Sequence, residues 1–243
     1  MVELLVILLS IFALLGLTFL RRKAARIFRP IPAFNQLYRL LGLSVEGGTR
    51  LHVSLGRGSL LTARGGPSLA GLAMLRHLTE RTSVGDLPPV ATTGDPALAL
   101  LMQDTLKAGY QAAAADELYQ PTTGRLSGVT PFSYAAGAMP VIMDENVSAN
   151  FLVGSFGPEV ALIADASLRA GTPMLGGTDD LAAQSILFAA SQEPLIGEEL
   201  FAASAYLSAD PSQAASLVLQ DILRWLLIAF LLGGALLKLV GVI

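Results

Sequence analysis

The sequence predicts an α/β domain, with a mainly parallel sheet and helices on both faces, flanked by two transmembrane helices. Three observations support this prediction. Five units of strand, glycine- or proline-containing turn and helix follow one another in the central region, apolar stretches lie at both ends of the 243 residues, and a basic cluster follows the first stretch. Alternating strands and helices favour parallel strands joined by right-handed crossovers.

The two apolar stretches are each long enough to cross a bilayer. Residues 2 to 20 contain one charge, Glu3, and residues 225 to 243 contain one, Lys238. A spanning helix needs roughly 20 apolar residues at about 1.5 Å per residue. We therefore expect residues 1 to 20 to form one transmembrane helix and the C-terminal stretch to form a second.

The basic residues near the first stretch indicate its orientation. They all follow it: Arg21, Arg22, Lys23, Arg26, Arg29 and Arg39. Because Lys and Arg beside a span stay in the cytoplasm, we expect a two-pass protein of the cell membrane, with both termini outside and the central domain cytoplasmic. The cluster itself suits contact with anionic lipid headgroups. A cleaved signal peptide is the alternative, but it needs a basic start, whereas this start is acidic.

Residues 21 to 49 are expected to form a basic juxtamembrane linker that contains a short amphipathic helix. Apolar side chains recur there at near-helical spacing: Phe34, Leu37, Tyr38, Leu40 and Leu41. Such a helix either lies at the membrane surface or docks onto the domain, and the sequence leaves both alternatives open.

The cytoplasmic domain is expected at residues 50 to 210. Its first unit is a strand at residues 50 to 55, a turn at Gly56, and a helix at residues 68 to 81. The other strands are expected at residues 89 to 93, 125 to 129, 150 to 155 and 172 to 175. The second strand is expected to be followed by a helix at residues 97 to 114, and the third by a helix from about residue 132 that Pro140 kinks or ends. The fourth and fifth strands are expected to be followed by helices that end at residues 169 and 190. This alternation is Rossmann-like.

Two more helices are expected to complete the chain. Residues 194 to 207 have the pattern of one further domain helix. Asp210 as N-cap and Pro211 at the first helical position then begin a run without a breaker before Gly233. Residues 211 to 243 are therefore expected to form one helix, about 50 Å long, that ends in the second span.

Small residues in the second span suit close helix packing in lipid. Ala229 and Gly233 form a small-xxx-small pair beside Gly234. This spacing allows the two spans to pack together or between subunits.

Composition argues against several classes of function. Residues 40 to 212 hold eight Arg or Lys and seventeen Asp or Glu, a net charge of −9. Such a body repels nucleic acid, whose affinity comes mostly from phosphate neutralisation. Cysteine is absent, and the two histidines, His52 and His77, lack metal-ligand spacing. We therefore expect no nucleic-acid partner, no cofactor and no metal.

The loops after the strands are the candidate ligand site, because ligands of open parallel sheets bind beyond the carboxyl ends of the strands. The candidate residues are Gly56, Arg57, Gly58, Ser59, Thr93, Gly94, Asp95, Gly157, Gly177 and Thr178. The loop after the first strand, which also holds Arg64, is the best anion candidate, although it matches neither G-x-G-x-x-G nor a P-loop.

Structural roles offer a simpler explanation for the same residues. Glycine at a strand-to-helix turn often provides a positive φ or a close backbone approach. Asp95, Glu159, Asp179 and Asp180 lie at expected helix starts, where a capping carboxylate contributes about 0.3–1 kcal/mol. A divalent cation held by these carboxylates is the alternative.

Four strings carry a resemblance to a known family: LHVSLGRGSL (51 to 60), TTGDPALALLMQD (92 to 104), NFLVGSFGPEVALIAD (150 to 165) and SQEPLIGEELFAASAYL (191 to 207). They resemble an uncharacterised bacterial membrane-protein family that carries a domain-of-unknown-function label, known from filamentous green non-sulfur bacteria and their relatives. The resemblance implies a terminal span at each end, a central α/β domain and the bacterial inner membrane. It implies no catalytic residues.

These features predict a membrane-anchored, non-enzymatic scaffold or accessory subunit at the cytoplasmic face, which self-associates or binds a membrane-protein partner. The alternative is a module that binds a small ligand, an anion or a nucleotide, through the glycine-containing loops. A hydrolase that uses Glu198 or Asp95 is a third alternative, and we do not expect an enzyme.

Overall fold

The computed structural model describes residues 11–12, 14–19, 28–60, 65–207 and 211–239. The chain divides into two compact units. One unit comprises residues 30–207, and the other combines residues 1–29 with residues 208–243. The unit of residues 30–207 contains the sheet and is called the domain below.

The domain alternates helices and strands from α2 to α7 and ends in a further helix, α8. Its described elements are α2 (Pro32–Glu46), β1 (Arg50–Gly56), α3 (Gly66–Thr82), β2 (Val90–Thr93), α4 (Pro96–Ala112), the 3-10 turns η2 (Asp116–Leu118) and η3 (Pro121–Thr123), β3 (Gly124–Leu126), α5 (Pro131–Asp144), β4 (Val147–Ser155), α6 (Val160–Arg169), β5 (Met174–Gly177), α7 (Leu181–Ala190) and α8 (Glu199–Leu207).

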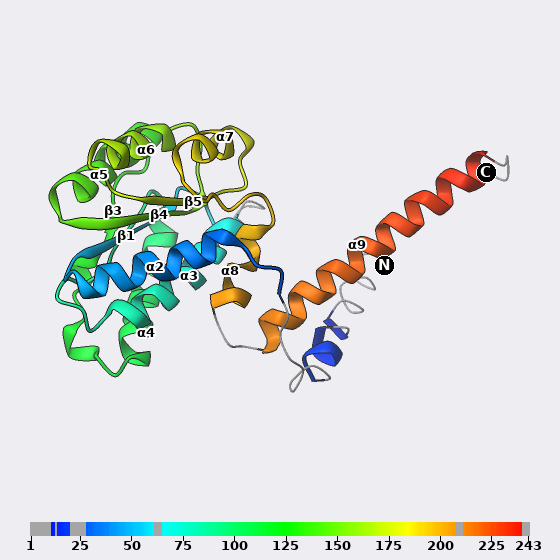
Figure 1. The fold of residues 1–243 in the computed structure, drawn as a ribbon, viewed down its shortest axis with the longest axis horizontal. Coiled ribbons are helices and arrows are strands. Elements are labelled where there is room, and N and C mark those ends of the chain that lie inside the picture. Colours follow the sequence, from blue (N-terminus) through cyan, green and yellow to red (C-terminus); the bar gives the residue numbers. More distant parts are fainter. Residues whose placement is uncertain (1–10, 13, 20–27, 61–64, 208–210, 240–243) are drawn as a thin grey trace. The chain divides into compact units, whose positions relative to one another are not determined.

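The five strands form one parallel sheet in the order β3-β2-β1-β4-β5. Helices α2, α3, α4 and α8 cover one face of it, and α5, α6 and α7 cover the other (Figure 1). The predicted α/β class, with a parallel sheet between two helical layers, is therefore confirmed. The strand order is that of doubly wound folds, in which the order reverses between β1 and β4.

Alternate residues of the central strands supply two separate cores. On β1, Leu51, Val53 and Leu55 point into the core beneath α2, α3, α4 and α8. Leu152 of β4 lies in the other core, with Tyr134 of α5. All five side chains are at most 1% exposed, so both cores shield them from solvent. Burial on both sheet faces is typical of parallel sheets.

One predicted helix start is wrong, and of the two outcomes expected at Pro140, a kink or an end, the end is excluded. The helix expected at residues 194 to 207 begins only at Glu199, because the Leu195 amide donates to the Gly176 carbonyl (2.7 Å) and Leu195 extends the sheet beyond β5. Helix α5 continues past Pro140 to Asp144. Buried side chains on both sides of that proline hold the helix against the sheet, which offsets the backbone hydrogen bond that proline removes.

Helix α2 docks onto the domain, which decides between the two alternatives for the amphipathic helix. Its buried residues are Ala33, Phe34, Leu37, Leu40, Leu41 and Ser44. The Phe34 ring stacks on the Tyr206 ring of α8, with a centroid distance of 4.6 Å and an interplanar angle of 17°. The Tyr38 hydroxyl donates to the Tyr206 carbonyl (3.4 Å).

In the other unit, α9 (Pro211–Leu239) is long and apolar enough to cross a membrane. Within its segment Ser212–Leu239, an 18-residue window has a mean hydropathy of 2.0, and the segment contains Ala229, Gly233 and Gly234. Of the first predicted span, only residues 11–12 and 14–19 are described, and they are helical. The rest of that span, the proposed cap Asp210, and the basic residues Arg21, Arg22, Lys23 and Arg26 lie outside the described residues.

Candidate binding site at the carboxyl ends of the strands

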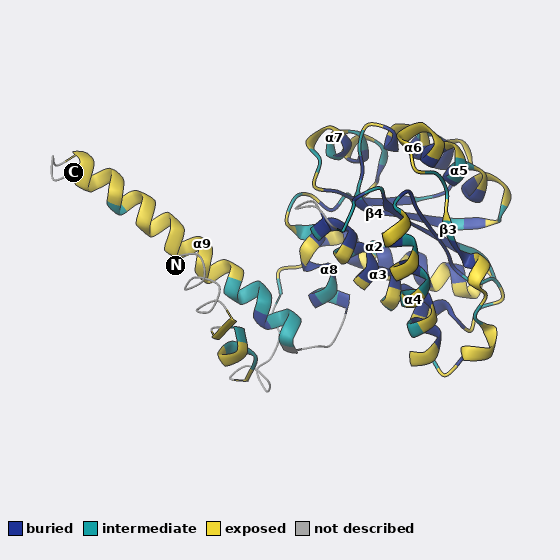
Figure 2. Ribbon diagram, turned by 180° about the vertical axis from the view of Figure 1, so that it is seen from behind, coloured by how far each residue is buried: buried dark blue, intermediate teal, exposed yellow. Residues whose placement is uncertain are grey.

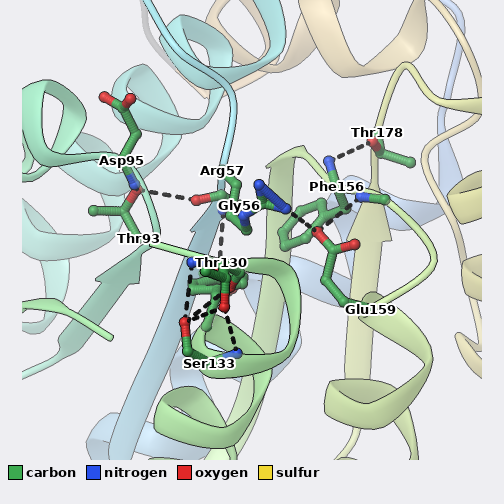
Figure 3. A network of polar contacts seen from close by, with 12 residues as sticks. Gly56, Arg57, Thr93, Asp95, Thr130, Ser133, Phe156, Glu159 and Thr178 are labelled. Carbon is green, nitrogen blue, oxygen red and sulfur yellow. Dashed lines mark hydrogen bonds and ion pairs between the residues drawn. The ribbon is translucent and has the colours of Figure 1, made fainter. Parts of the chain in front are cut away.

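The candidate site lies where the strand order reverses, at the carboxyl ends of β1 and β4. The chain leaves β1 toward α3 on one face of the sheet and leaves β4 toward α6 on the other. In doubly wound sheets this divergence leaves the crevice in which ligands bind. Figure 3 shows the network of polar contacts at these strand ends.

Gly56, the last residue of β1, lies where no other residue fits. Its φ is +72°, and a Cβ atom there would lie 2.1 Å from the Ser155 carbonyl oxygen of β4. The next amide, that of Arg57, donates to the same carbonyl (2.8 Å). Glycine is therefore required by both the turn and the close approach of the two strands.

Hydrogen bonds tie the end of β1 to its neighbours. The Gly56 carbonyl accepts from the Thr93 hydroxyl (3.0 Å) and from the Gly94 amide (2.9 Å) at the end of β2. The Gly56 amide donates to the Tyr134 hydroxyl of α5 (3.2 Å), which also hydrogen-bonds Ser54. Thr93 and Gly94 thus hold the loop after β1 in place, because their polar groups form hydrogen bonds with the backbone of Gly56.

Arg57 extends from this loop across the strand ends to Glu159 (Figure 3). Its guanidinium Nη1 lies 3.6 Å from Glu159 Oε1, which makes an ion pair. The stem of Arg57 packs on Gly94, because a Cβ at Gly94 would lie 2.4 Å from Arg57 Cγ. Arg57 is 27% exposed, whereas Glu159 is 3% exposed, so the pair joins a partly accessible cation to a buried carboxylate.

Glu159 does not cap α6, although its position suggested this role. Its side chain turns back instead, and Oε1 accepts from the Gly157 amide (3.0 Å). A buried carboxylate needs such partners, since leaving it unpaired is costly. The loop after β4 therefore contributes the acidic half of the site through Glu159, which the sequence indicated as a capping residue or, alternatively, as a cation ligand.

The helices that start near the strand ends differ in their caps. Asp95 caps α4 through the Leu98 amide (2.8 Å) and Asp180 caps α7 through the Ala182 and Ala183 amides. Thr130 and Ser133 form a capping box on α5. Among the described residues, helices α3 and α6, which follow β1 and β4, have no side-chain cap. Of the five helices that directly follow a strand, these two flank the reversal of strand order.

The remaining candidates divide between this site and the structure around it. The Thr178 hydroxyl accepts from the Phe156 amide (3.3 Å), which joins the ends of β5 and β4. The Gly58 carbonyl accepts from the Ser68 hydroxyl (3.1 Å), which closes the first loop. Gly177 packs against Leu195, because a Cβ atom at position 177 would lie 2.9 Å from Leu195 Cβ. Gly177 therefore has a packing role. Ser59 is half-buried in the same loop as Arg57, and Arg64 lies outside the described residues.

A buried polar chain crosses the sheet beneath the site. The Thr92 hydroxyl lies 2.9 Å from His52 Nε2, His52 Nδ1 lies 2.8 Å from Asn150 Oδ1, and Asn150 Nδ2 donates to Ser167 (2.7 Å). Burial lowers the pKa of His52 to about 4 and raises the pKa of Tyr134 to about 12. Both side chains are therefore neutral at physiological pH.

Sequence reasoning missed Tyr134, whose partner is distant in the chain, and also the local capping box of Thr130 and Ser133. Tyr134, Thr130 and Ser133 follow β3, yet Tyr134 contacts the end of β1. The Thr130-Pro131 pair with Ser133 three residues after the cap was a usable signal for a capping box. Nothing local indicates the reach of the Tyr134 hydroxyl.

The arrangement suits an anion better than a cation. The N-terminus of α3, which has no side-chain cap among the described contacts, and the partly exposed Arg57 guanidinium favour negative charge, since helix N-termini carry a partial positive charge. At α6 the amides of residues 160 to 162 already bond to carbonyls, and Glu159 pairs Arg57. Within the described ranges, no group of three or more His, Asp or Glu side chains is arranged to hold a metal ion.

Comparison with known proteins gives one result. No curated protein and no solved structure is significantly similar to the chain. The sequence model of one family, described as a domain of unknown function, matches residues 1–243. This match covers the whole chain, so the protein belongs to the DUF6754 family.

Proposed function

We propose that the chain is a membrane-anchored, non-enzymatic scaffold or accessory subunit, whose domain lies on the cytoplasmic side and associates with itself or with a membrane-protein partner. Two transmembrane helices would hold it, α9 and a helix formed by residues 1 to 20. The lipid bilayer is its first partner.

The observation that best supports this proposal is the contact between the first and last helices of the domain. Phe34, two residues after the start of α2, stacks on Tyr206, one residue before the end of α8. The two chain connections that leave the domain, before α2 and after α8, therefore start close together. A domain held by two spans on one membrane face needs its connections to leave from one place.

The charge of the chain supports the orientation. The five basic residues between positions 21 and 29 follow the first apolar stretch, and Lys and Arg beside a span are retained in the cytoplasm. Residues 40 to 212 carry a net charge of −9, so the basic linker, and not this acidic region, matches anionic headgroups.

Single-cysteine labelling tests the topology, because the natural chain has no cysteine. Leu100→Cys reports on the domain, since Leu100 is 71% exposed on α4, and Val242→Cys reports on the C-terminus. In intact cells, a membrane-impermeant maleimide should label Val242→Cys and should label Leu100→Cys only after permeabilisation. Labelling of Leu100→Cys in intact cells would exclude a cytoplasmic domain.

Blue-native electrophoresis of detergent extracts tests the scaffold role. We expect a species larger than the 25.4 kDa chain with its detergent, either a homo-oligomer or a complex with a co-purifying protein. A monomer without any co-purifying partner contradicts the proposed role.

A second candidate function is the binding of a small anion or nucleotide at the strand ends. It is favoured by the N-terminus of α3, which has no side-chain cap among the described contacts and follows the loop that holds Arg57. Thermal unfolding should be measured with inorganic phosphate, nucleotides and carboxylates, since a ligand at 100 times its Kd stabilises the folded state by about 2.7 kcal/mol. A stabilised wild type and an unresponsive Arg57→Ala variant support the site, whereas equal responses contradict it.

A further inference from the structure

Arg57 has hydrogen-bond donors that the described residues do not use. Its one ionic contact among them, from Nη1 to Glu159 Oε1, is 3.6 Å long and therefore longer than a hydrogen bond. Its Nε is buried without a hydrogen-bond partner. A guanidinium carries five N–H donors, and a buried donor without an acceptor costs stability. The side chain is 27% exposed, so a ligand can approach it from solvent.

Both members of this ion pair are held in place by the chain around them. A Cβ atom at Gly94 would lie 2.4 Å from Arg57 Cγ, so the stem of Arg57 fills the space beside that glycine. Glu159 accepts from the Gly157 amide (3.0 Å) and is 3% exposed. It follows β4, which is buried along most of its length (Figure 2). A ligand that binds Arg57 therefore meets a guanidinium with a carboxylate fixed beside it.

The strand ends carry more negative than positive charge. Their described loop residues are 57–60, 65, 94–95, 127–130, 156–159 and 178–180. These residues include one cation, Arg57, and four carboxylates, those of Asp95, Glu159, Asp179 and Asp180, which gives a net charge of −3. Because Coulomb energy is proportional to the charge of the ligand, a dianion is disfavoured here more than a monoanion.

The backbone around Arg57 also offers few donors to a phosphate group. The amides of residues 160 to 162, at the start of α6, donate to carbonyls of residues 157 to 159. Pro67, in the first turn of α3, has no N–H. A phosphate has three strong acceptor oxygens, whereas a carboxylate has two, which a guanidinium can bind in a bidentate geometry. A carboxylate therefore finds a larger share of its hydrogen bonds here than a phosphate.

We propose that the strand-end site binds its ligand through a single carboxylate group on Arg57, and that Glu159 makes the site reject phosphate. Glu159 is then the specificity-determining residue, since its charge lies beside the guanidinium that the ligand must reach. This inference rests on the second candidate function, the binding of a small anion, and narrows it: nucleotides are not ligands.

Thermal unfolding of the full-length chain in detergent measures this preference with two probes, acetate and inorganic phosphate. At pH 8 acetate is a monoanion and phosphate is mainly a dianion, and sodium chloride keeps the ionic strength constant. The apparent Kd of each probe follows from the rise of the thermal midpoint with its concentration. We expect the wild type to bind acetate about tenfold more tightly than phosphate.

Removal of the Glu159 charge tests its role directly. Glu159→Gln keeps an oxygen that accepts from the Gly157 amide, and phosphate should bind it about tenfold more tightly than the wild type, with a smaller gain for acetate. Glu80→Gln is the matched control, because Glu80 is exposed and lies near the end of α3 that is remote from the strand ends. It should keep the wild-type preference. Arg57→Met should abolish both responses, each variant being compared with its own ligand-free midpoint.

The outcomes separate this inference from the function on which it rests. A preference for acetate that Glu159→Gln reduces and Glu80→Gln keeps supports the inference. Equal or tighter binding of phosphate by the wild type overturns it, and so does a preference that changes equally in both variants or in neither. If Arg57→Met still abolishes the responses, the anion site itself stands. A wild type that responds to neither probe overturns the inference together with the second candidate function and leaves the scaffold role standing.

Discussion

His52 Nδ1 lies 2.8 Å from Asn150 Oδ1, and this contact joins the two central strands of the sheet inside the core. The Asn150 amide nitrogen donates to Ser167, so its oxygen is the acceptor and His52 Nδ1 carries the proton. The other ring nitrogen, Nε2, then accepts from the Thr92 hydroxyl (2.9 Å). The chain of hydrogen bonds is complete only while His52 is neutral.

We therefore predict that the protein loses stability in mild acid because of His52. Burial lowers the folded-state pKa of this side chain to about 4, against 6.5 in the unfolded chain. The unfolded chain thus binds the proton first as the pH falls. The stabilisation is complete above pH 6.5 and is lost between pH 6.5 and about 4, with a total of about 3 kcal/mol.

Urea unfolding of the full-length chain in detergent, followed by circular dichroism between pH 7.5 and 4.5, measures this loss. His52→Gln is neutral and should flatten the pH dependence of the free energy of unfolding. His77→Gln is the control, because His77 is less buried, though its pKa is also lowered by burial, and most of the slope should remain. A His52→Gln variant with the full slope would show that other groups cause it.

A second prediction separates backbone strain from steric clash at glycine. Gly56 and Gly171 both have positive φ, +72° and +65°, but a Cβ at Gly171 would meet nothing within 4 Å. Gly171→Ala should therefore cost about 1 kcal/mol, the penalty of a left-handed residue. Gly56→Ala adds a collision with the Ser155 carbonyl and should cost about 3 kcal/mol or more. Equal urea midpoints for the two variants would contradict the close approach of β1 and β4.

The parts of the fold that depend on local signals were predictable from the sequence. Each strand and helix follows from its own periodicity, and the need for glycine at Gly56 follows from the turn after β1. The caps formed by Asp95 and Asp180 are local in the same sense, because each side chain binds amides within three residues.

Contacts between distant segments were not predictable from these signals. The order of the strands depends on long-range pairing. The late start of α8 depends on Leu195 reaching the Gly176 carbonyl of β5, which competes with a helical pattern that is locally good. The role of Glu159 was missed for the same reason, since a carboxylate at a helix start resembles a cap unless its partner Arg57 is known.

The pairing of Arg57 with Glu159 gives the third prediction. Arg57→Met keeps the stem that packs on Gly94 but leaves the buried Glu159 carboxylate with the Gly157 amide as its one hydrogen-bond donor among the described contacts. We expect a loss of about 1–3 kcal/mol in the free energy of unfolding. Glu159→Gln still accepts from Gly157, so adding it to Arg57→Met should recover stability, with a coupling of about 1 kcal/mol. Additive effects in urea unfolding would show that the two side chains do not interact.

The stacking of Phe34 on Tyr206 gives the last prediction, which concerns how the domain is held. Phe34 is 3% exposed, so Phe34→Ala should destabilise the domain by about 3 kcal/mol and free α2 and α8 together. Hydrogen exchange of the full-length chain should then show faster exchange in both helices and unchanged exchange in β1 and β4. Leu43→Ala, at a 52% exposed position of the same helix, should change neither. Faster exchange in α2 alone would mean that the two connections are held independently, and the domain would then need no common anchoring point for its two ends.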